Sequence, residues 1–469
     1  MALNALDRHL ALIGFMGAGK TTIAPEVAAR LGRRSVEADR TVEGRIQLKI
    51  GEFFARRGET EFRVVEAALL RDLLDSGEPA VLDLGGGVLK TSTTRAALAR
   101  RAFTVALAVD ADTAWRRVEG TDRPLAADEA EFRRLYDERA PVYVEAADAV
   151  VSSGDVDGVL LAAAGVHHEP GALDRLGELV PGDGAVALVA DEHVLDLYGD
   201  RARIALGDRL ASSHGLPSGE AATRLGEVER LWRELTLDRD GTVVALGGGT
   251  TTDVAGFAAA TYLRGISWVA VPTTLVGQVD AAIGGKTGVD TPDGKNLAGV
   301  FHWPARVIID DTLLTTLPEQ ERRNGEAERL KTELLAGHPL DARGAAAYKC
   351  AICLRDPHDR GVRRWLNLGH TFGHALEAAS GFELAHGEAV ALGLLAALRL
   401  SGRDTAPVES ALDPQPIRVD RERAWSALQR DKKRAGGEIN LVLLGSDGPI
   451  VEPRPPHEVR TALDSLIAD

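Results

Sequence analysis

Short apolar runs alternate with longer amphipathic segments along the first two thirds of the chain. The runs predict strands at residues 10–15, 80–84, 104–109, 185–190, 243–246, 268–271 and 307–309. An amphipathic segment at residues 20–30 predicts the first helix. Because strands that alternate with helices are typical of parallel sheets with crossover helices, the pattern predicts an α/β fold.

A change in composition and a change in periodicity divide the chain into three parts. Glycine, proline and acidic residues are concentrated at residues 154–184, which predicts a domain junction near residue 165. Beyond Asp311 the strand pattern fades, and segments such as LNLGHTFGHALEAA and HGEAVALGLLAALRL have helical periodicity. We therefore expect two α/β domains, residues 1–165 and 166–310, and a mostly α-helical domain, residues 311–469.

Charge and cysteine usage narrow the class of protein. The net charge of −15 (55 Lys plus Arg against 70 Asp plus Glu) argues against a nucleic-acid or anionic-membrane surface. Cys350 and Cys353 are the only cysteines, too few for a disulfide framework, and they favour a reducing cytoplasm. The N-terminus has no signal-peptide pattern, and the longest apolar stretch, residues 389–398, is about half of a membrane span. We expect a cytoplasmic enzyme with small-molecule substrates.

The first chemical motif is a phosphate-binding loop. Residues 14–21, GFMGAGKT, follow a predicted strand and open a helix, as in the G-x-x-x-x-G-K-S/T pattern. The glycines let backbone N–H groups turn toward phosphate oxygens, the lysine reaches the β- and γ-phosphates, and the threonine hydroxyl binds Mg²⁺. The predicted ATP and Mg²⁺ contacts are Gly14, Gly17, Gly19, Lys20, Thr21 and Thr22.

Motifs downstream of this loop narrow it to one family. They are Glu37-Ala-Asp39, GETEFRVVE (58–66), Gly85-Gly86-Gly87, Arg123-Pro-Leu and DERAPVY (137–143). Together they resemble shikimate kinases over residues 8–150. The resemblance implies a P-loop kinase domain, with a parallel sheet and helices on both faces.

The same resemblance assigns roles in the kinase domain. Shikimate would be held by Asp39, Arg63, Gly86 and Arg139. Two guanidinium groups suit a small carboxylate, and Asp39 could accept the proton of the attacking hydroxyl. Arg123 would be the lid arginine that, with Lys20, stabilises the transferring phosphoryl group. Glu37 stands where the family has an aspartate that holds Mg²⁺ through water.

A second set of motifs begins after residue 240. The apolar run VVALG ends in a triple glycine, residues 247–249, followed by a predicted helix, a geometry that lets a pyrophosphate approach the backbone. Further motifs are DVAGF (253–257), YLRG (262–265), VPTT (271–274), QVD (278–280), GGKTG (284–288) and GKN (294–296). As an ordered set they resemble 3-dehydroquinate synthases.

The helical part adds a candidate metal site. Glu328 and Lys331 lie three residues apart on one helical face, and two histidines four residues apart, His370 and His374, lie on another. His386 opens the next predicted helix. One carboxylate and two imidazoles suit a catalytic Zn²⁺ with positions left open for substrate. The resemblance assigns the ligands of Zn²⁺ or Co²⁺ as Glu328, His370 and His386.

The resemblance to synthases implies a Rossmann-like NAD domain, a metal-binding helical domain and further site residues. The implied NAD⁺ contacts are Asp191, Glu220, Gly248, Gly249, Asp253, Thr273, Thr274, Asp280, Lys295 and Asn296. The implied substrate contacts are Arg264, Lys286, Asn296, Lys331, Lys349, Arg363, Asn367, Lys432 and Lys433. Those implied to be catalytic are Lys286, Lys331, Lys349, Arg363, Asn367 and His374. Arg264 resembles a residue that reaches into a neighbouring subunit, which implies a homodimer.

Three departures from the synthase pattern concern the site. Thr223 stands where the family has a lysine, so one NAD⁺ contact is expected to be lost. Asp359 stands where a glutamate is usual. The segment between Lys331 and Lys349 is a helix or two shorter than in the family, which predicts a displaced Lys349 or a more open site.

The complete pattern predicts two shikimate-pathway enzymes in one chain. The first would catalyse the ATP-dependent 3-phosphorylation of shikimate. The second would catalyse the NAD⁺- and metal-dependent cyclisation of 3-deoxy-arabino-heptulosonate 7-phosphate to 3-dehydroquinate, with release of phosphate. Two alternatives stay open for the second half: a related cyclase that acts on a neutral sugar phosphate, and a catalytically degenerate synthase-like module. A polyol dehydrogenase is disfavoured because it has no use for so many phosphate-binding lysines.

Overall fold

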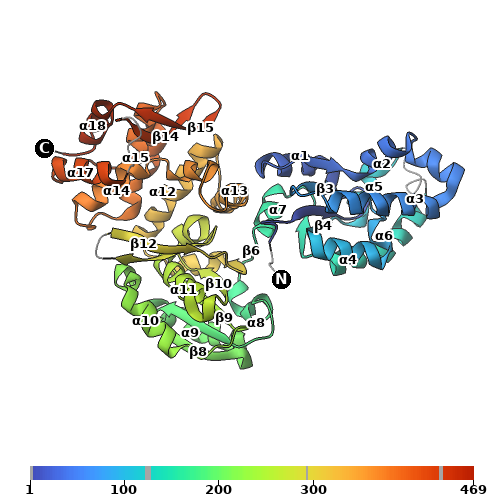
Figure 1. Cartoon of the computed structure of the whole chain (residues 1–469), viewed down its shortest axis with the longest axis horizontal. Coiled ribbons are helices and arrows are strands. Elements are labelled where there is room, and N and C mark those ends of the chain that lie inside the picture. Colours follow the sequence, from blue (N-terminus) through green and yellow to red (C-terminus); the bar gives the residue numbers. More distant parts are fainter. Residues whose placement is uncertain (1–3, 122–127, 292–293, 432–436, 469) are drawn as a thin grey trace. The chain divides into compact units, whose positions relative to one another are not determined.

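The structure is a computed structural model that describes residues 4–121, 128–291, 294–431 and 437–468 (Figure 1). The chain divides into two compact units, Met1–Val166 and His167–Asp469. Both units contain a sheet with parallel strands and covering helices, so the predicted α/β fold class is confirmed.

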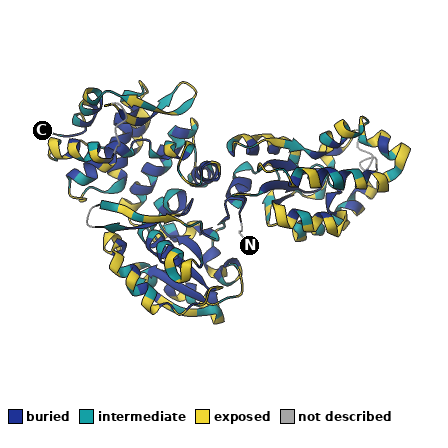
Figure 2. Cartoon of the chain, in the orientation of Figure 1, coloured by how far each residue is buried: buried dark blue, intermediate teal, exposed yellow. Residues whose placement is uncertain are grey.

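The N-terminal unit is built on a five-stranded parallel sheet in the order β2-β3-β1-β4-β5. Its strands are β1 (His9–Ile13), β2 (Ser35–Glu37), β3 (Val81–Asp83), β4 (Ala102–Ala108) and β5 (Ala149–Ser152). Its helices are α1 (Lys20–Arg30), α2 (Ala38–Ile46), α3 (Ile50–Leu74), α4 (Ser92–Arg101), α5 (Ala111–Val118), α6 (Glu129–Ala146) and α7 (Val156–Ala163). Every residue of β1 and β3 is buried, as expected of strands covered on both faces. Figure 2 shows the exposed positions mainly on the helices.

The second unit opens with a six-stranded sheet in the order β6-β13-β10-β9-β7-β8. Its strands are β6 (Val166–His168), β7 (Val186–Asp191), β8 (Leu210–Leu216), β9 (Thr242–Gly247), β10 (Ser267–Pro272) and β13 (Arg306–Ile309). The helices beside them are α8 (Leu176–Leu179), α9 (Glu192–Leu206), α10 (Leu225–Glu234) and α11 (Gly249–Thr261). The short π-helix η7 (Gly277–Ala281) follows β10. Strand β9 is buried throughout and ends at the glycine turn, which places this turn at the carboxyl edge of the sheet.

The rest of the second unit is mostly helical. Its helices are α12 (Glu319–Ala336), α13 (Ala342–Arg355), η9 (Val362–Asn367), α14 (His370–Ala379), α15 (His386–Leu400), α16 (Ala406–Leu412), α17 (Arg421–Asp431) and α18 (Pro456–Asp464). The longest apolar stretch of the sequence lies in α15, where residues 389–398 are all buried. Within the described ranges, no helix combines the length and the apolar character that a membrane crossing needs.

The apolar pattern did not predict two antiparallel hairpins. One pairs β11 (Lys286–Thr291) with β12 (Gly294–Phe301), and the other pairs β14 (Ile439–Gly445) with β15 (Gly448–Arg454). Alternating apolar and polar residues indicate a strand only when one of its faces is buried. No position of β12 is buried, so its sequence lacks this alternation. The first hairpin carries Lys286, Lys295 and Asn296 on paired strands.

Candidate active sites

The glycine loop of the N-terminal unit joins β1 to α1. Gly14, Gly17 and Gly19 all have positive φ (143°, 81° and 82°), and a Cβ on Gly17 would lie 2.6 Å from the carbonyl oxygen of Ala114. The Nζ of Lys20 donates to the carbonyl oxygens of Gly14 (2.8 Å) and Phe15 (3.2 Å), so the lysine reaches across the loop. This arrangement leaves the start of α1, where Thr21 and Thr22 are exposed, to face an anion.

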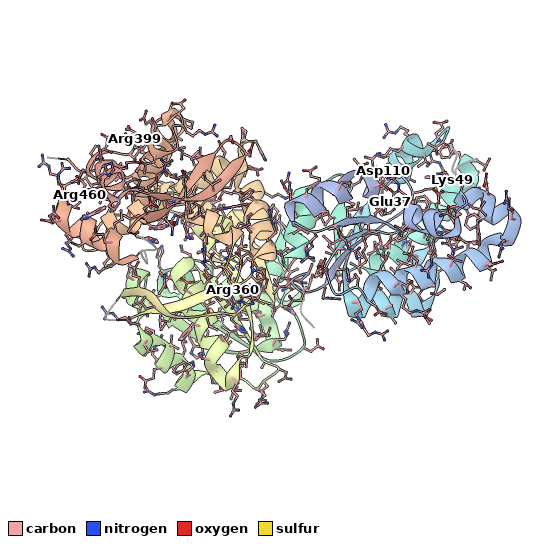
Figure 3. The ribbon with its side chains drawn as sticks, turned by 45° about the horizontal axis from the view of Figure 1, so that its top comes forward. Glu37, Lys49, Asp110, Arg360, Arg399 and Arg460 are labelled. Carbon is pink, nitrogen blue, oxygen red and sulfur yellow. The ribbon has the colours of Figure 1, made fainter. Side chains whose placement is uncertain are left out.

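Beside the loop lie oxygen donors that fit Mg²⁺. The hydroxyl of Thr21 donates to Oδ2 of Asp83, the last residue of β3, at 2.6 Å. Glu37 ends the adjacent strand β2 and pairs in register with Asp83 (Figure 3 labels Glu37). Hydroxyl and carboxylate oxygens are the ligands that Mg²⁺ prefers, either directly or through water. No motif of the sequence indicated a role for Asp83.

A second anion site forms around the triple glycine that follows β3. A Cβ on Gly85 would lie 2.6 Å from Oδ1 of Asp39, and one on Gly87 would overlap the guanidinium of Arg63. Glycine is therefore required for these two side chains to reach the turn. Burial raises the pKa of Tyr143, and the guanidinium of nearby Arg139 offsets part of this rise. The Tyr143 hydroxyl donates to the carbonyl oxygen of Gly86. The structure thus gathers the predicted shikimate contacts at one turn, while Arg123 lies outside the described residues.

Two acids hold Arg63 at this turn. Its guanidinium contacts Glu66 at 2.7 Å and Glu59 at 2.9 Å. Hydrogen bonds from Lys90 and Arg63 lower the pKa of Glu59 to about 2, so Glu59 is ionised. Burial raises the pKa of Glu66 despite the attraction of Arg63. A bound carboxylate would compete with these acids for the guanidinium.

In the second unit, a cavity of about 930 Å³ adjoins the carboxyl edge of the sheet. Nine of the ten predicted NAD⁺ contacts line it, namely Asp191, Glu220, Gly248, Gly249, Asp253, Thr273, Thr274, Lys295 and Asn296. His374 and His386 of the helical region line the same cavity. Burial raises the pKa of Asp253 to about 8, an effect that the nearby acids Asp290, Asp280 and Glu220 increase. The cavity therefore joins the glycine turn to the histidine cluster.

The position of Thr223 explains how the fold accommodates the missing lysine. The Thr223 hydroxyl donates to Oδ2 of Asp290 at 2.6 Å. Lys295 instead pairs with Glu220 at 2.7 Å, and its Nζ lies 4.5 Å from the ring centroid of Phe382. A lysine from the β12 strand thus pairs with Glu220, three residues before Thr223.

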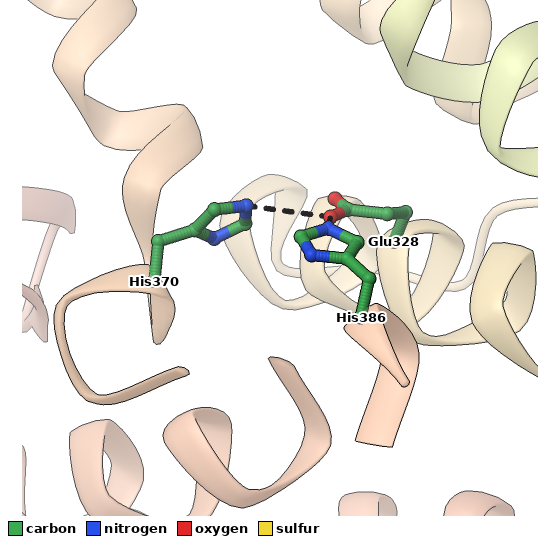
Figure 4. Close-up of side chains that lie close together, drawn as sticks. All are labelled: Glu328, His370 and His386. Carbon is green, nitrogen blue, oxygen red and sulfur yellow. Dashed lines mark hydrogen bonds and ion pairs between the residues drawn. The ribbon is translucent and has the colours of Figure 1, made fainter. Parts of the chain in front are cut away.

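Three side chains from separate helices form the candidate metal centre (Figure 4). One ligand atom from each of Glu328, His370 and His386 lies within 4.8 Å of the others. Nε2 of His386 is 2.9 Å, and Nε2 of His370 3.3 Å, from Oε1 of Glu328. Nδ1 of His370 hydrogen-bonds the carbonyl oxygen of Leu368 at 3.2 Å, so its Nε2 is turned toward the centre. A carboxylate and two oriented imidazoles fit Zn²⁺ or Co²⁺.

A carboxylate that the sequence analysis missed orients the third ligand. Oε1 of Glu377 lies 3.1 Å from Nδ1 of His386, and Glu377 is buried. Burial opposes protonation of His386, but hydrogen bonds to Glu328 and Glu377 outweigh it and raise the pKa to about 10. Glu377 lies three residues after His374 on α14, a helical spacing that could have indicated it.

Behind the metal centre, two buried lysines form ion pairs. Nζ of Lys331 lies 2.5 Å from Oε2 of Glu328 and 3.5 Å from Oδ1 of Asp280. Nζ of Lys349 lies 2.8 Å from the same Asp280 oxygen. Burial disfavours the ionised Glu328, yet Lys331 and His370 outweigh it and keep its pKa well below the ordinary value. Lys349 thus lies within this ion-pair network despite the short segment that precedes it.

The remaining predicted residues lie in three places. Arg363 is buried and donates to the carbonyl oxygens of Gly284 (2.8 Å) and Pro357 (2.9 Å). Lys286 pairs with Asp359 at 2.5 Å, and Asn367 ends η9 half-buried. Arg264 is exposed in the turn between α11 and β10, where Leu263 and Arg264 both have positive φ (51° and 72°). Lys432 and Lys433 lie outside the described residues.

Comparison with known proteins supports both halves. A family model described as shikimate kinase matches residues 16–159. Models described as the N-terminal and C-terminal parts of 3-dehydroquinate synthase match residues 214–324 and 307–434. The 3-dehydroquinate synthase of Symbiobacterium thermophilum is 39% identical over 342 residues, covering 63% of this chain and 96% of the relative. The Bordetella pertussis synthase is 39% identical over 344 residues, covering 64% and 95%.

Two solved structures of other synthases resemble the second unit. A 2-deoxy-scyllo-inosose synthase complexed with carbaglucose-6-phosphate, NAD⁺ and Co²⁺ has a TM-score of 0.57 and 24% identity, which shows a shared fold. A 2-epi-5-epi-valiolone synthase from Streptomyces hygroscopicus, with NAD⁺ and Zn²⁺ bound, has a TM-score of 0.54 and 26% identity. Each comparison covers 64% of this chain and 96% of the other. The chain belongs to the 3-dehydroquinate synthase family and carries a shikimate kinase domain ahead of the synthase in the same polypeptide.

Proposed function

We propose that the chain carries out two reactions of the shikimate pathway. The N-terminal unit transfers a phosphoryl group from ATP to the 3-hydroxyl of shikimate. The second unit converts 3-deoxy-arabino-heptulosonate 7-phosphate to 3-dehydroquinate and phosphate. The observation that carries the proposal for the second unit is the cavity that joins the glycine turn, Gly248 and Gly249, to the histidines of the metal centre.

In the kinase half, the chain positions two charged substrates. The glycine loop and Lys20 bind the ATP phosphates, and Mg²⁺, when bound beside Thr21, neutralises their charge. Arg63 and Arg139 hold the shikimate carboxylate at the Gly85–Gly87 turn. Asp39, at the same turn, orients the attacking hydroxyl and accepts its proton. Arg123 is assigned the lid role by resemblance alone.

In the synthase half, the chain holds NAD⁺, a metal ion and a phosphorylated acid in one cavity. When bound, NAD⁺ supplies reversible hydride transfer, and Zn²⁺ or Co²⁺ supplies Lewis-acid polarisation of the substrate oxygen. The glycine turn receives the pyrophosphate at the start of α11. Buried Lys331 contacts the candidate metal ligand Glu328, and buried Lys349 contacts Asp280, to which Lys331 also pairs. Arg363 is fixed by two backbone carbonyls. His374 lines the cavity beside His370 and is placed to exchange a proton with the substrate.

We also propose a homodimer and a cytoplasmic location. Arg264 is exposed on a turn with two consecutive residues of positive φ, a strained backbone that presents the guanidinium outward. In a homodimer this group could reach the phosphate site of the partner subunit. Both cysteines are free and buried in α13, as expected of a chain from a reducing compartment.

The test measures both reactions on the full chain. Phosphate release from 3-deoxy-arabino-heptulosonate 7-phosphate should require NAD⁺ and a divalent metal ion, and His370→Ala should abolish it. Shikimate-dependent formation of ADP should survive in His370→Ala and be lost in Lys20→Ala, which should keep phosphate release. If the wild-type chain releases no phosphate while it still phosphorylates shikimate, the synthase proposal is wrong, and neutral sugar phosphates are the next substrates to test.

A further inference from the structure

A buried aspartate lies directly beside the phosphate-binding loop. Asp83 is the last residue of β3 and only 6% exposed. It accepts a hydrogen bond from the hydroxyl of Thr21, 62 residues earlier in the chain, at 2.6 Å. Thr21 is the loop residue whose hydroxyl is expected to bind Mg²⁺. The contact therefore ties a fixed carboxylate to the proposed metal position.

The sheet topology explains why the carboxylate is held there. Strand β3 lies between β2 and β1, and Asp83 pairs with Glu37 on one side and with Leu12 on the other. All three strands are parallel, so their carboxyl ends meet at one edge, where α/β folds bind ligands. Leu12 lies two residues before Gly14, the first residue of the loop. Asp83 thus occupies the central position of this edge.

The two carboxylates of this edge differ in how firmly they are held. Glu37 is half-buried at the end of the edge strand β2, and its side chain has one more methylene group to order. Asp83 has a short side chain, is buried, and is hydrogen-bonded to the loop itself. Mg²⁺ demands near-octahedral geometry and usually keeps several waters, so a rigid carboxylate suits it better than a mobile one.

The direction of the hydrogen bond matters for the metal. An ionised carboxylate can only accept, so the Thr21 hydroxyl is the donor. With its proton directed at Asp83, the hydroxyl oxygen has its lone pairs free to bind a cation. A carboxylate has about four lone-pair sites, so Asp83 has the capacity to accept a hydrogen bond from a metal-bound water in addition to the one from Thr21.

We propose that Asp83 is a positioning residue for the Mg²⁺ of the kinase site, that it orients the Thr21 hydroxyl and holds a metal-bound water, and that it outweighs Glu37 in this role. The inference rests on the proposed kinase function. It explains how the site accommodates a glutamate at position 37, where the resemblance leads us to expect an aspartate.

The test measures metal affinity directly. Mn²⁺ serves as the probe, and its binding to the full chain saturated with ADP is followed by electron paramagnetic resonance in wild type, Asp83→Asn and Glu37→Gln. Loss of an outer-shell partner costs about 10- to 100-fold in metal affinity, and we expect a loss of this size for Asp83→Asn and less than about threefold for Glu37→Gln. The reverse order, or unchanged affinity in Asp83→Asn, would overturn the proposal.

Two further measurements separate this result from misfolding and from failure of the proposed function. Affinity for ADP without metal should be no weaker than in wild type in either variant, because both substitutions remove a negative charge from beside the phosphates, and this result reports an intact loop. If Asp83→Asn binds ADP more weakly than wild type, Asp83→Ser replaces it in the experiment. The serine keeps an acceptor for the Thr21 hydroxyl but removes the charge, so the same loss of Mn²⁺ affinity is expected. Raised Mg²⁺ should restore part of the kinase rate of the Asp83 variant. If the wild-type chain binds Mn²⁺–ADP but phosphorylates no shikimate, the proposed kinase function is wrong. The comparison of Mn²⁺ affinities would still test the role of Asp83.

Discussion

At the residue scale, the side chains that the sequence could assign are those within recognisable motifs, whereas their supporting partners come from elsewhere in the chain. The loop residue Thr21 was predicted, but Asp83, to which it donates, lies 62 residues away. Glu328 and His386 were predicted, but Glu377, which orients His386, was not. Such partners are set by tertiary packing, which a local pattern does not contain.

Glu377 should control metal affinity more than turnover. Because its carboxylate lies 3.1 Å from Nδ1 of His386, Glu377→Ala should weaken Zn²⁺ binding about 10- to 100-fold. Glu377→Gln keeps an acceptor for Nδ1 of His386, so it should weaken Zn²⁺ binding less than Glu377→Ala does. Competition with a chelator of known affinity measures both values, and phosphate release at saturating Zn²⁺ should be recovered largely in both variants. Equal affinity in wild type and Glu377→Ala would contradict the role.

Asp253 should make stability of the NAD⁺-free protein depend on pH. Its folded-state pKa is raised to about 8 from an ordinary value of 3.8, so the fold favours the protonated form. The stability contributed by this proton is complete below the ordinary pKa and is lost as the pH rises toward about 8. The side chain introduced by Asp253→Asn is neutral at every pH. The melting temperature of Asp253→Asn, relative to that of wild type, should therefore rise between pH 5 and pH 8. A difference that stays constant over this range would refute the assignment.

At the scale of elements, the buried parallel strands were predictable because both of their faces are apolar, and the helix α1 was predicted at its exact bounds, residues 20–30. The hairpin of β11 and β12 was not, because β12 is open to solvent and its glycines and lysine suggest a loop. The short segment between Lys331 and Lys349 led us to expect either a displaced Lys349 or a more open site. Instead α13 itself brings Lys349 to Asp280 of η7.

The turn before β11 should tolerate no side chain. Gly284 has φ +94°, and a Cβ there would lie 2.5 Å from both a guanidinium nitrogen of Arg363 and the sulfur of Cys353. Gly284→Ala should therefore displace Arg363 and lower kcat/KM for phosphate release by about tenfold or more. Gly337→Ala is the matched control, since Gly337 has φ +76° but nothing within 4 Å. The control should cost only about 1–2 kcal/mol in unfolding free energy, with turnover unchanged.

At the scale of the whole molecule, the homodimer can be tested by mixing two inactive variants. If Arg264 acts in the partner's site, a dimer of one Arg264→Ala and one His370→Ala subunit contains one intact site. Random reassociation of equal amounts should then restore about a quarter of the wild-type phosphate release. A mixture that stays inactive, although mass measurements show exchanged subunits, would place Arg264 in its own subunit's site. An Arg264→Ala protein that is fully active by itself would remove Arg264 from both sites.

The buried ion pairs behind the metal centre have a thermodynamic consequence. Glu328 directs one oxygen to the histidines and the other to Lys331, which also contacts Asp280, one of the predicted NAD⁺ contacts. A metal ion bound at Glu328 changes the electrostatic potential at the NAD⁺ site, and bound NAD⁺ changes the potential at the metal site, because Lys331 contacts acids of both. The two binding equilibria are then coupled, and by reciprocity the factor by which metal strengthens NAD⁺ binding equals the factor by which NAD⁺ strengthens metal binding.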